Sequence, residues 1–135
     1  MNEFLNFLFN FLLESYEAND KAVRFRVCQL INKLLNQMGD DASIDDDMAD
    51  RIYDCMLVRV RDKFPNVRSQ AIAALARLQD PQDPECPVIS SYLRIMQIDK
   101  SAEVRRAALL NVALSAQTLP FIIGKHTVTT INFVL

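Results

Sequence analysis

The sequence predicts an all-α fold in which about three pairs of helices stack side by side into a solenoid. Three observations lead to this prediction. The 135 residues include only 2 Gly, a short pattern of apolar and basic residues recurs three times, and prolines and aspartates stand between the copies. A single helix pair cannot cover its own apolar face, whereas stacked neighbours cover each other.

The composition narrows the class of protein before any motif is considered. Hydrophobic residues make up 50% of the chain, which is enough for the core of one domain. The scarcity of glycine disfavours hairpin-rich all-β folds and leaves no room for a glycine-rich phosphate loop. The net charge of -2 provides no overall attraction to nucleic acid, so any basic surface must be local. Three widely spaced cysteines indicate reduced thiols in the cytosol or nucleus.

The recurring pattern begins with the dipeptide Val-Arg at Val23, Val67 and Val104. Its copies are spaced by 44 and 37 residues, close to the roughly 40-residue period of HEAT and armadillo repeats. The dipeptide Asp-Lys stands five residues before the second and the third copy. Apolar residues at offsets 0, 4, 5 and 8 of each copy share one face of a helix. We therefore expect an α-solenoid of about three HEAT-type helix pairs, an ARM-repeat-like superhelix.

The segments before each copy supply the partner helices. Residues 4–13 are apolar on nearly all sides, which predicts a helix packed between neighbours. Residues 80–84 contain two prolines and end the second pair, and Pro87 begins the next helix. We expect a HEAT-repeat segment at 1–124, followed by a divergent, irregular tail at 125–135. The expected pairs cover 1–38, 45–79 and 87–116, with helices at about 1–16, 20–38, 45–61, 65–79, 87–98 and 101–116.

The arginine of each copy is predicted to have a structural role. Helical periodicity places it inside the apolar arc, where a guanidinium is costly unless carboxylates or carbonyl oxygens satisfy it. The aspartate of each Asp-Lys dipeptide stands in the turn before its copy. We expect these arginines and aspartates to form a ladder that ties neighbouring repeats together. The ladder residues are Arg24, Arg68, Arg105, Asp62 and Asp99.

A second group of basic residues is predicted to point away from the core. These residues fall on the far side of the repeat helices or crowd the turn before the second copy. Such an excess can neutralise phosphates along duplex DNA without reading base sequence. The alternative is a solvated face in which basic residues favour helix C-termini, and spacing alone leaves both open. The DNA-contact candidates are Arg26, Lys33, Arg59, Arg61, Lys63 and Arg77.

The sequence contains no recognisable catalytic or metal-binding pattern. His126 is the only histidine and lies outside the repeats, so neither a catalytic triad nor a zinc site can be assembled. The acidic run at 40–50 lacks the spacing, glycine and closing glutamate of an EF-hand. No basic residues flank the apolar segment at 4–13, which argues against a membrane-surface helix. We therefore expect a protein that is not an enzyme, with no cofactor, metal, small-molecule substrate or membrane.

Several longer stretches resemble one family, and they include loops between repeats as well as helices. They are residues 11–19, 23–35, 65–68, 74–81, 85–88, 103–107 and 118–120. Over residues 11–124 the chain is similar to the CAP-G family, the HEAT-repeat subunits of animal condensin I. The resemblance implies a non-catalytic role in mitotic chromosome condensation, with ATP hydrolysis left to the SMC subunits. It also implies docking on the kleisin subunit CAP-H and, through it, association with the SMC subunits and the other HEAT subunit.

The resemblance further implies a DNA site and a location. In this family the HEAT subunit and the kleisin together form a positively charged groove that holds duplex DNA, in the nucleus on condensed mitotic chromosomes and also in the cytoplasm. Family members are much longer, and the tail after Lys125 departs from their pattern, so we expect a truncated or fragment form. The alternative is a protein-binding HEAT scaffold or adaptor that makes no contact with DNA.

Overall fold

The computed structural model describes residues 2–39, 43–116 and 118–123, and every regular element within these ranges is helical. The predicted all-α fold is therefore confirmed. The expected irregular tail at 125–135 lies outside the described residues, as does His126. The helices are α1 (Asn2–Leu13), α2 (Lys21–Gln37), α3 (Asp46–Arg59), α4 (Pro65–Leu75), the 3₁₀ turn η1 (Ala76–Leu78), α5 (Pro87–Ile98), α6 (Ala102–Asn111) and α7 (Leu119–Ile123).

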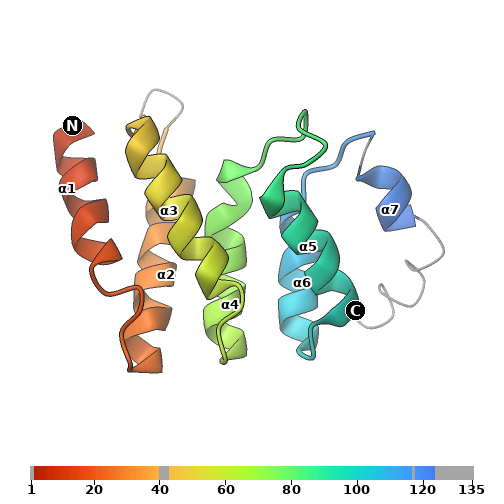
Figure 1. The fold of residues 1–135 in the computed structure, drawn as a ribbon, viewed down its shortest axis with the longest axis horizontal. Helices are drawn as coiled ribbons and strands as arrows, with labels where there is room; N and C mark the ends of the chain where they lie inside the picture. Colours follow the sequence, from red (N-terminus) through yellow and green to blue (C-terminus); the bar gives the residue numbers. More distant parts are fainter. Residues whose placement is uncertain (1, 40–42, 117, 124–135) are drawn as a thin grey trace.

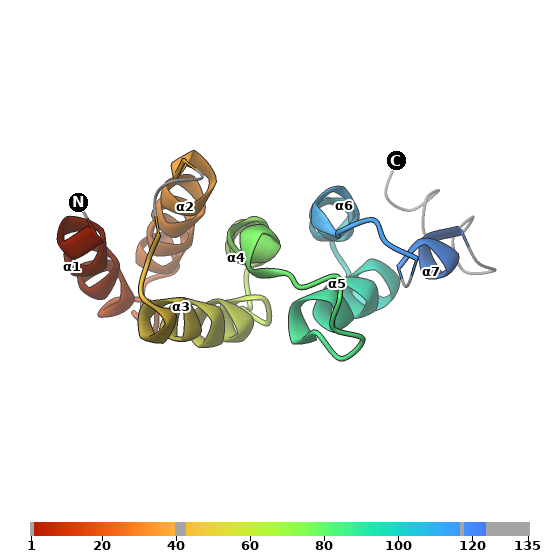
Figure 2. The same cartoon turned by 90° about the horizontal axis from the view of Figure 1, so that it is seen from above.

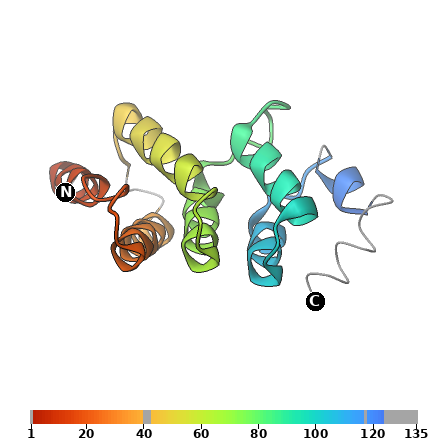
Figure 3. The same cartoon turned by 60° about the horizontal axis from the view of Figure 1, so that its bottom comes forward.

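The helices form two layers that run along the long axis of the molecule (Figure 1). Seen from above, α2, α4 and α6 stand in one row, which we call the inner layer, and α3 and α5 lie in the other, outer layer (Figure 2). The tilted view in Figure 3 shows the same two rows. In the inner layer α4 packs against both α2 and α6, and each outer helix packs on the inner helix that follows it. This is the predicted α-solenoid of three stacked helix pairs.

The repeated valine occupies the same place in each inner helix. Val23, Val67 and Val104 are the third residues of α2, α4 and α6. Val67 and Val104 are fully buried, but Val23 is 39% exposed. The difference follows from position in the stack, because no inner helix of the described chain precedes α2 and covers this flank. The register is shared, whereas burial depends on having a neighbour.

The core is continuous between the two layers. Ile31, Ile52, Ile72 and Tyr92 are fully buried and come from four successive helices. The Tyr92 hydroxyl donates a hydrogen bond to the carbonyl oxygen of Ile72, so its polar atom is satisfied. Burial raises the pKa of Tyr92. Each such side chain contributes about 1.5–3 kcal/mol through apolar burial. The described helices include none with the length and apolar character needed to cross a membrane.

Helix α1 differs from its prediction, because it is packed on one side only. Phe9 is fully buried, whereas Phe4, Phe7 and Phe11 are 65%, 68% and 61% exposed. These three residues share the face that points away from α2 and α3. One side of this apolar helix therefore packs against its neighbours, and the other side is exposed to solvent in this chain.

Helix α6 ends at Asn111, earlier than the predicted residue 116. The side chain of Gln79, from the end of the preceding repeat, accounts for this. Its Nε2 donates to the carbonyl oxygen of Asn111 (2.6 Å), and its Oε1 accepts from the amide of Ala113 (2.8 Å). Val112 between them has extended backbone angles. Gln79 thus satisfies the backbone at the helix end, which local periodicity does not reveal.

Candidate functional site

The ladder arginines lie at one end of the inner layer, each as the fourth residue of its helix. Arg24 joins two repeats. Its Nη1 donates to the carbonyl oxygens of Ala18 (2.7 Å) and Asn19 (2.8 Å) in its own turn. Its Nε donates to Oδ2 of Asp62 in the next pair, at 2.8 Å. The hydrogen bond to Asp62 raises the pKa of Arg24.

Arg68 repeats this arrangement one pair further along. Its Nη1 donates to the carbonyl oxygens of Asp62 (2.9 Å) and Lys63 (3.2 Å). Its Nε and Nη2 donate to the two carboxylate oxygens of Asp99, both at 2.9 Å. Arg105 likewise donates through Nη1 to the carbonyl oxygen of Asp99. The structure therefore places the five ladder residues together, with two forked contacts between consecutive pairs.

Asp62 is the centre of a buried charge cluster. Its side chain is 2% exposed and accepts from Arg24, from Arg59 Nη1 at 3.0 Å, and from the amide of Phe64 at 3.0 Å. Burial alone raises the pKa of this carboxyl, but the Arg24 and Phe64 hydrogen bonds and the two nearby positive charges outweigh it, so the pKa is lowered overall. Asp62 is therefore a carboxylate at neutral pH.

Arg59 does not point away from the core as expected. Its side chain is 14% exposed, forms the ion pair with Asp62 and lies 5.8 Å from the centre of the Tyr16 ring. Its Nε is buried and has no hydrogen-bond partner within the described residues. The long side chain folds back toward the turn because Asp62 is three residues away, so Arg59 is not available as an outward-facing cation.

Arg77 also differs from its expected role, although its side chain lies at the surface. Its Nη1 donates to the carbonyl oxygens of Leu35 (2.6 Å) and Met38 (2.7 Å), and its Nη2 donates to that of Gly39 (3.4 Å). These carbonyls belong to the C-terminal end of α2, which carries partial negative charge. Arg77 thus caps a helix of the preceding repeat, and its hydrogen-bonding groups are largely occupied.

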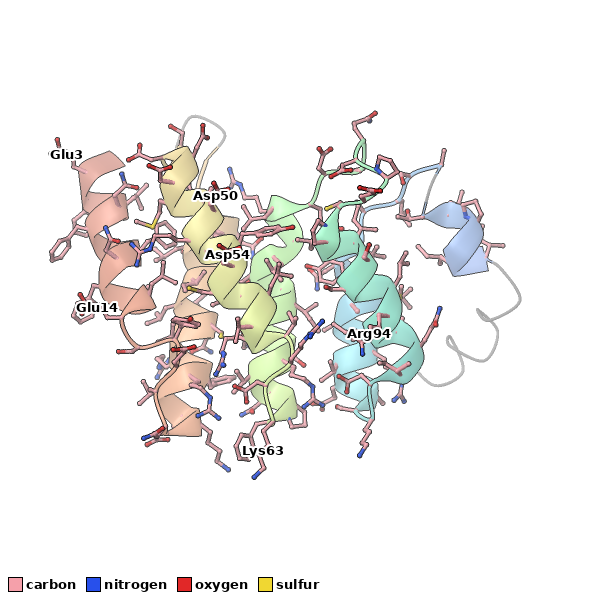
Figure 4. The ribbon with its side chains drawn as sticks, viewed as in Figure 1. Glu3, Glu14, Asp50, Asp54, Lys63 and Arg94 are labelled. Carbon is pink, nitrogen blue, oxygen red and sulfur yellow. The ribbon has the colours of Figure 1, made fainter. Side chains whose placement is uncertain are left out.

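The other four DNA-contact candidates are exposed but fall into two groups. Arg26 and Lys33 lie on α2, where Arg26 donates to Gln29 Oε1 at 2.7 Å. Arg61 and Lys63 lie in the turn between α3 and α4, and Figure 4 shows Lys63 at that end of the molecule. The structure thus places two of these cations on α2 and the other two in the turn between α3 and α4.

A groove of about 690 Å³ opens between the turn after α3 and the exposed side of α5. We call it the α3–α5 groove. It brings Arg61 and Lys63 together with two basic residues outside the predicted DNA-contact set, Arg94 and Lys100. Lys100 could have been predicted from the sequence, because it occupies the same repeat position as Lys63. Arg94 occupies no position of the repeat pattern and could not. The lining residues are Val60, Arg61, Asp62, Lys63, Arg68, Pro87, Ser90, Ser91, Arg94, Ile95, Ile98, Asp99 and Lys100.

Chemically reactive groups are few in the part of the chain that the structure describes. Within it, no three His, Cys, Asp or Glu side chains are grouped so as to hold a metal ion. Cys28 is fully buried, and burial raises the pKa of its thiol to about 12, so the nucleophilic thiolate is scarce at neutral pH.

These features define the class of protein. Stacked helix pairs with a shared register, joined by arginine–aspartate contacts at one end of the inner helices, make this chain a HEAT-repeat α-solenoid. No family model matches the sequence. The chain is, however, 59% identical over 121 residues to human Condensin complex subunit 3, and 56% identical over 124 residues to the protein of the same name from Xenopus laevis.

The similarity extends to a fungal relative and to a solved structure. Condensin complex subunit 3 of Schizosaccharomyces pombe is 42% identical over 115 residues. A chain in the crystal structure of the S. pombe condensin Cnd3–Cnd2 subcomplex matches with a TM-score of 0.75 and 39% identity, covering 87% of this chain and 15% of that one. The matches span 90% and 92% of this chain for the human and frog relatives, but only 12% of either relative.

Proposed function

We propose that this chain is a non-catalytic HEAT-repeat module of condensin, which contributes to binding of the kleisin subunit and to non-specific binding of duplex DNA in mitotic chromosome condensation. The single observation that carries this proposal is the similarity of about nine-tenths of the chain to Condensin complex subunit 3, at 59% identity to the human protein. The solved relative was crystallised as a Cnd3–Cnd2 subcomplex, which supports a protein partner for this fold. The SMC subunits and the other HEAT subunit join through the kleisin.

The proposed DNA contacts are the four of the six candidate cations that are exposed and neither pair with Asp62 nor cap α2. They are Arg26, Lys33, Arg61 and Lys63. Arg59 and Arg77 are no longer part of the set, because the first is paired with Asp62 and the second caps α2. Contacts of this kind gain affinity by releasing counterions from the phosphate backbone and do not read base sequence. The module works on chromosomes in the nucleus, with a further pool in the cytoplasm.

A binding titration tests the DNA part of the proposal. A short fluorescein-labelled duplex is titrated with the chain at several salt concentrations, and the slope of log K against log salt is determined. For Lys33→Glu and for Arg61→Glu, tested separately, we expect weaker binding and a slope reduced by about 0.9 for each lost phosphate contact. Arg106→Glu on α6 is the matched control, because it changes the net charge equally from an exposed position.

The outcomes separate the proposal from its alternative. Equal weakening by all three variants would show that only net charge matters and would remove the residue assignment. Absence of duplex binding, together with co-purification of the kleisin CAP-H, would favour a protein-binding scaffold without DNA contact. If the kleisin also failed to co-purify with the chain, the condensin role of this segment would be contradicted.

A further inference from the structure

The α3–α5 groove exists because the outer layer is not evenly packed. Helices α1 and α3 pack against each other, whereas α3 and α5 lack packing of that extent. The wall on the α5 side is a single helical stripe, which includes Ser91, Arg94 and Ile98 at spacings of three and four residues. An adjacent outer helix would cover this stripe if the layer were closed here.

The groove has an excess of positive charge. Arg61, Lys63, Arg94 and Lys100 are all exposed. The two acidic residues of the wall cannot neutralise them, because Asp62 is bound by Arg24 and Arg59 and Asp99 is bound by Arg68. The chain as a whole carries a net charge of -2, so this concentration of positive charge is a local property that attracts anionic ligands.

The same groove also contains apolar surface. Val60 and Ile95 form buried parts of its wall, and Ile98 is 60% exposed at its edge. Ser90 and Ser91 add hydroxyl groups on the α5 stripe. A phosphate backbone gains nothing from apolar surface, since a charged group buried against it loses solvation. A peptide with an apolar side chain between acidic ones would match both the apolar and the basic residues of the wall.

The neighbouring surface also disfavours a wide, highly charged ligand. Asp50 and Asp54 are exposed on α3 of the outer layer, where Figure 4 labels both, and neither lines the groove. A duplex laid across the outer layer would approach these carboxylates, whereas an extended peptide is narrow enough to avoid them. A volume of about 690 Å³ is within the roughly 300–1,000 Å³ range of ligand pockets.

We propose that the α3–α5 groove binds an acidic peptide segment of a partner protein, with an apolar side chain of the segment against Ile95 and Ile98 and its carboxylates near Arg61, Lys63, Arg94 and Lys100. Charge complementarity selects this occupant, and the apolar wall distinguishes it from DNA. Such a segment binds in extended form and obtains its specificity from one apolar anchor and its flanking charges.

Fluorescence anisotropy on the full chain tests this site with three labelled probes. They are a short Asp/Glu-rich peptide with a central Phe, the same peptide with Ser in place of Phe, and a short DNA duplex. The Phe peptide should bind about ten-fold more tightly than the Ser peptide. Arg94→Glu should weaken binding of the Phe peptide about ten-fold, Ile98→Ser should reduce its preference over the Ser peptide, and Arg106→Glu should leave both unchanged.

Arg61 and Lys63 belong to both proposals, whereas Arg94 and Ile98 are not among the proposed DNA contacts and Lys33 does not line the groove. Variants of Arg94 and Ile98 therefore test the peptide site, and Lys33→Glu tests the DNA contacts. Far-UV circular dichroism melts verify that each variant is folded. No binding of the Phe peptide, equal binding of both peptides, or insensitivity to Arg94→Glu would overturn the proposal. Competition between duplex and peptide, with equal loss of both on Arg94→Glu, would instead assign the groove to DNA.

Discussion

The two junctions between consecutive helix pairs are alike in the inner layer and different in the outer layer. At both junctions an arginine from one inner helix reaches the aspartate before the next, as Arg24 reaches Asp62 and Arg68 reaches Asp99. Each aspartate also accepts from an amide two residues later, at Phe64 and at Ser101. The inner contact therefore follows the sequence repeat.

At the first junction α1 closes the space beside α3, because these two helices pack against each other. There, Asn6 of α1 donates to Asp45 at 2.6 Å, and Arg51 of α3 donates to Asn10 of α1. Arg59 adds a second guanidinium to Asp62. At the second junction the corresponding space is the α3–α5 groove. The comparison shows that a repeat can fix how inner helices stack while leaving the outer surface to residues outside the pattern.

The largest expected effect is on stability at the first junction. Asp62→Ala removes the carboxylate that two partly buried guanidiniums share, so we expect a loss of about 3–5 kcal/mol in the free energy of unfolding. Asp99→Ala takes the carboxylate from only one guanidinium, that of Arg68. Arg68 keeps its hydrogen bonds to the carbonyl oxygens of Asp62 and Lys63. A smaller loss, about 1–3 kcal/mol, is expected there.

Urea denaturation of the two variants measures the difference directly. Because both substitutions also remove one cap to a turn amide, that loss cancels in the comparison. Asp54→Ala on the exposed face of α3 is the control and should change stability by less than about 0.5 kcal/mol. Equal losses for Asp62→Ala and Asp99→Ala would mean that Arg59 adds nothing to the first junction.

The pH dependence of stability should report the charge of Asp62 at the first junction. The folded-state pKa of Asp62 is lowered, so its contribution is fully present above the unfolded-state value of about 3.9 and is lost as the pH falls through the lower folded-state value. We expect the stability gap between the original chain and Asp62→Asn to be constant near neutral pH and to shrink below about pH 4. Urea midpoints measured across this range test it, and a gap that widened on acidification would contradict the assignment.

A smaller effect is expected from the cap that crosses the first junction. Arg77→Ala removes the donor that satisfies three carbonyls at the end of α2. We expect a loss of about 1 kcal/mol and faster amide hydrogen exchange at Met38, whose amide bonds to Leu34 in the last turn. Arg77→Lys should recover only part of the loss, because an ammonium lacks the planar fork. Unchanged exchange at Met38 would rule out capping.

The sequence predicted well those features that depend on position within the repeat. Val67 and Val104 are buried as third residues of their helices, and the arginine after each stands near the turn aspartates, because register decides both. Residues with long-range partners were not predictable in this way. Arg77 folds onto carbonyls about one repeat earlier, and Gln79 ends a helix in the following repeat. Their roles depend on how neighbouring repeats are spaced.

The α3–α5 groove was unpredictable for a related reason. Helical periodicity identifies which side of α5 is apolar, but not that α3 stays apart from that side. Arg94 is outside the repeat pattern, so only its place beside Arg61 and Lys63 makes it notable. Lys100 could have been predicted, because it follows Asp99 as Lys63 follows Asp62.

The smallest expected effect is the stability change in Arg94→Glu, and it sharpens the contrast between the junctions. Arg94 is exposed and lies in the groove with Arg61, Lys63 and Lys100, so reversing its charge removes repulsion and breaks no ion pair among the described residues. The change in unfolding free energy should stay within about 0.5 kcal/mol of zero. If thermal melts showed a loss as large as that of Asp99→Ala, Arg94 would be part of the packing and the groove would be a structural joint like the first junction. A neutral result, combined with weakened peptide binding, assigns the positive charge at the second junction to a partner, because the fold itself has no need of it.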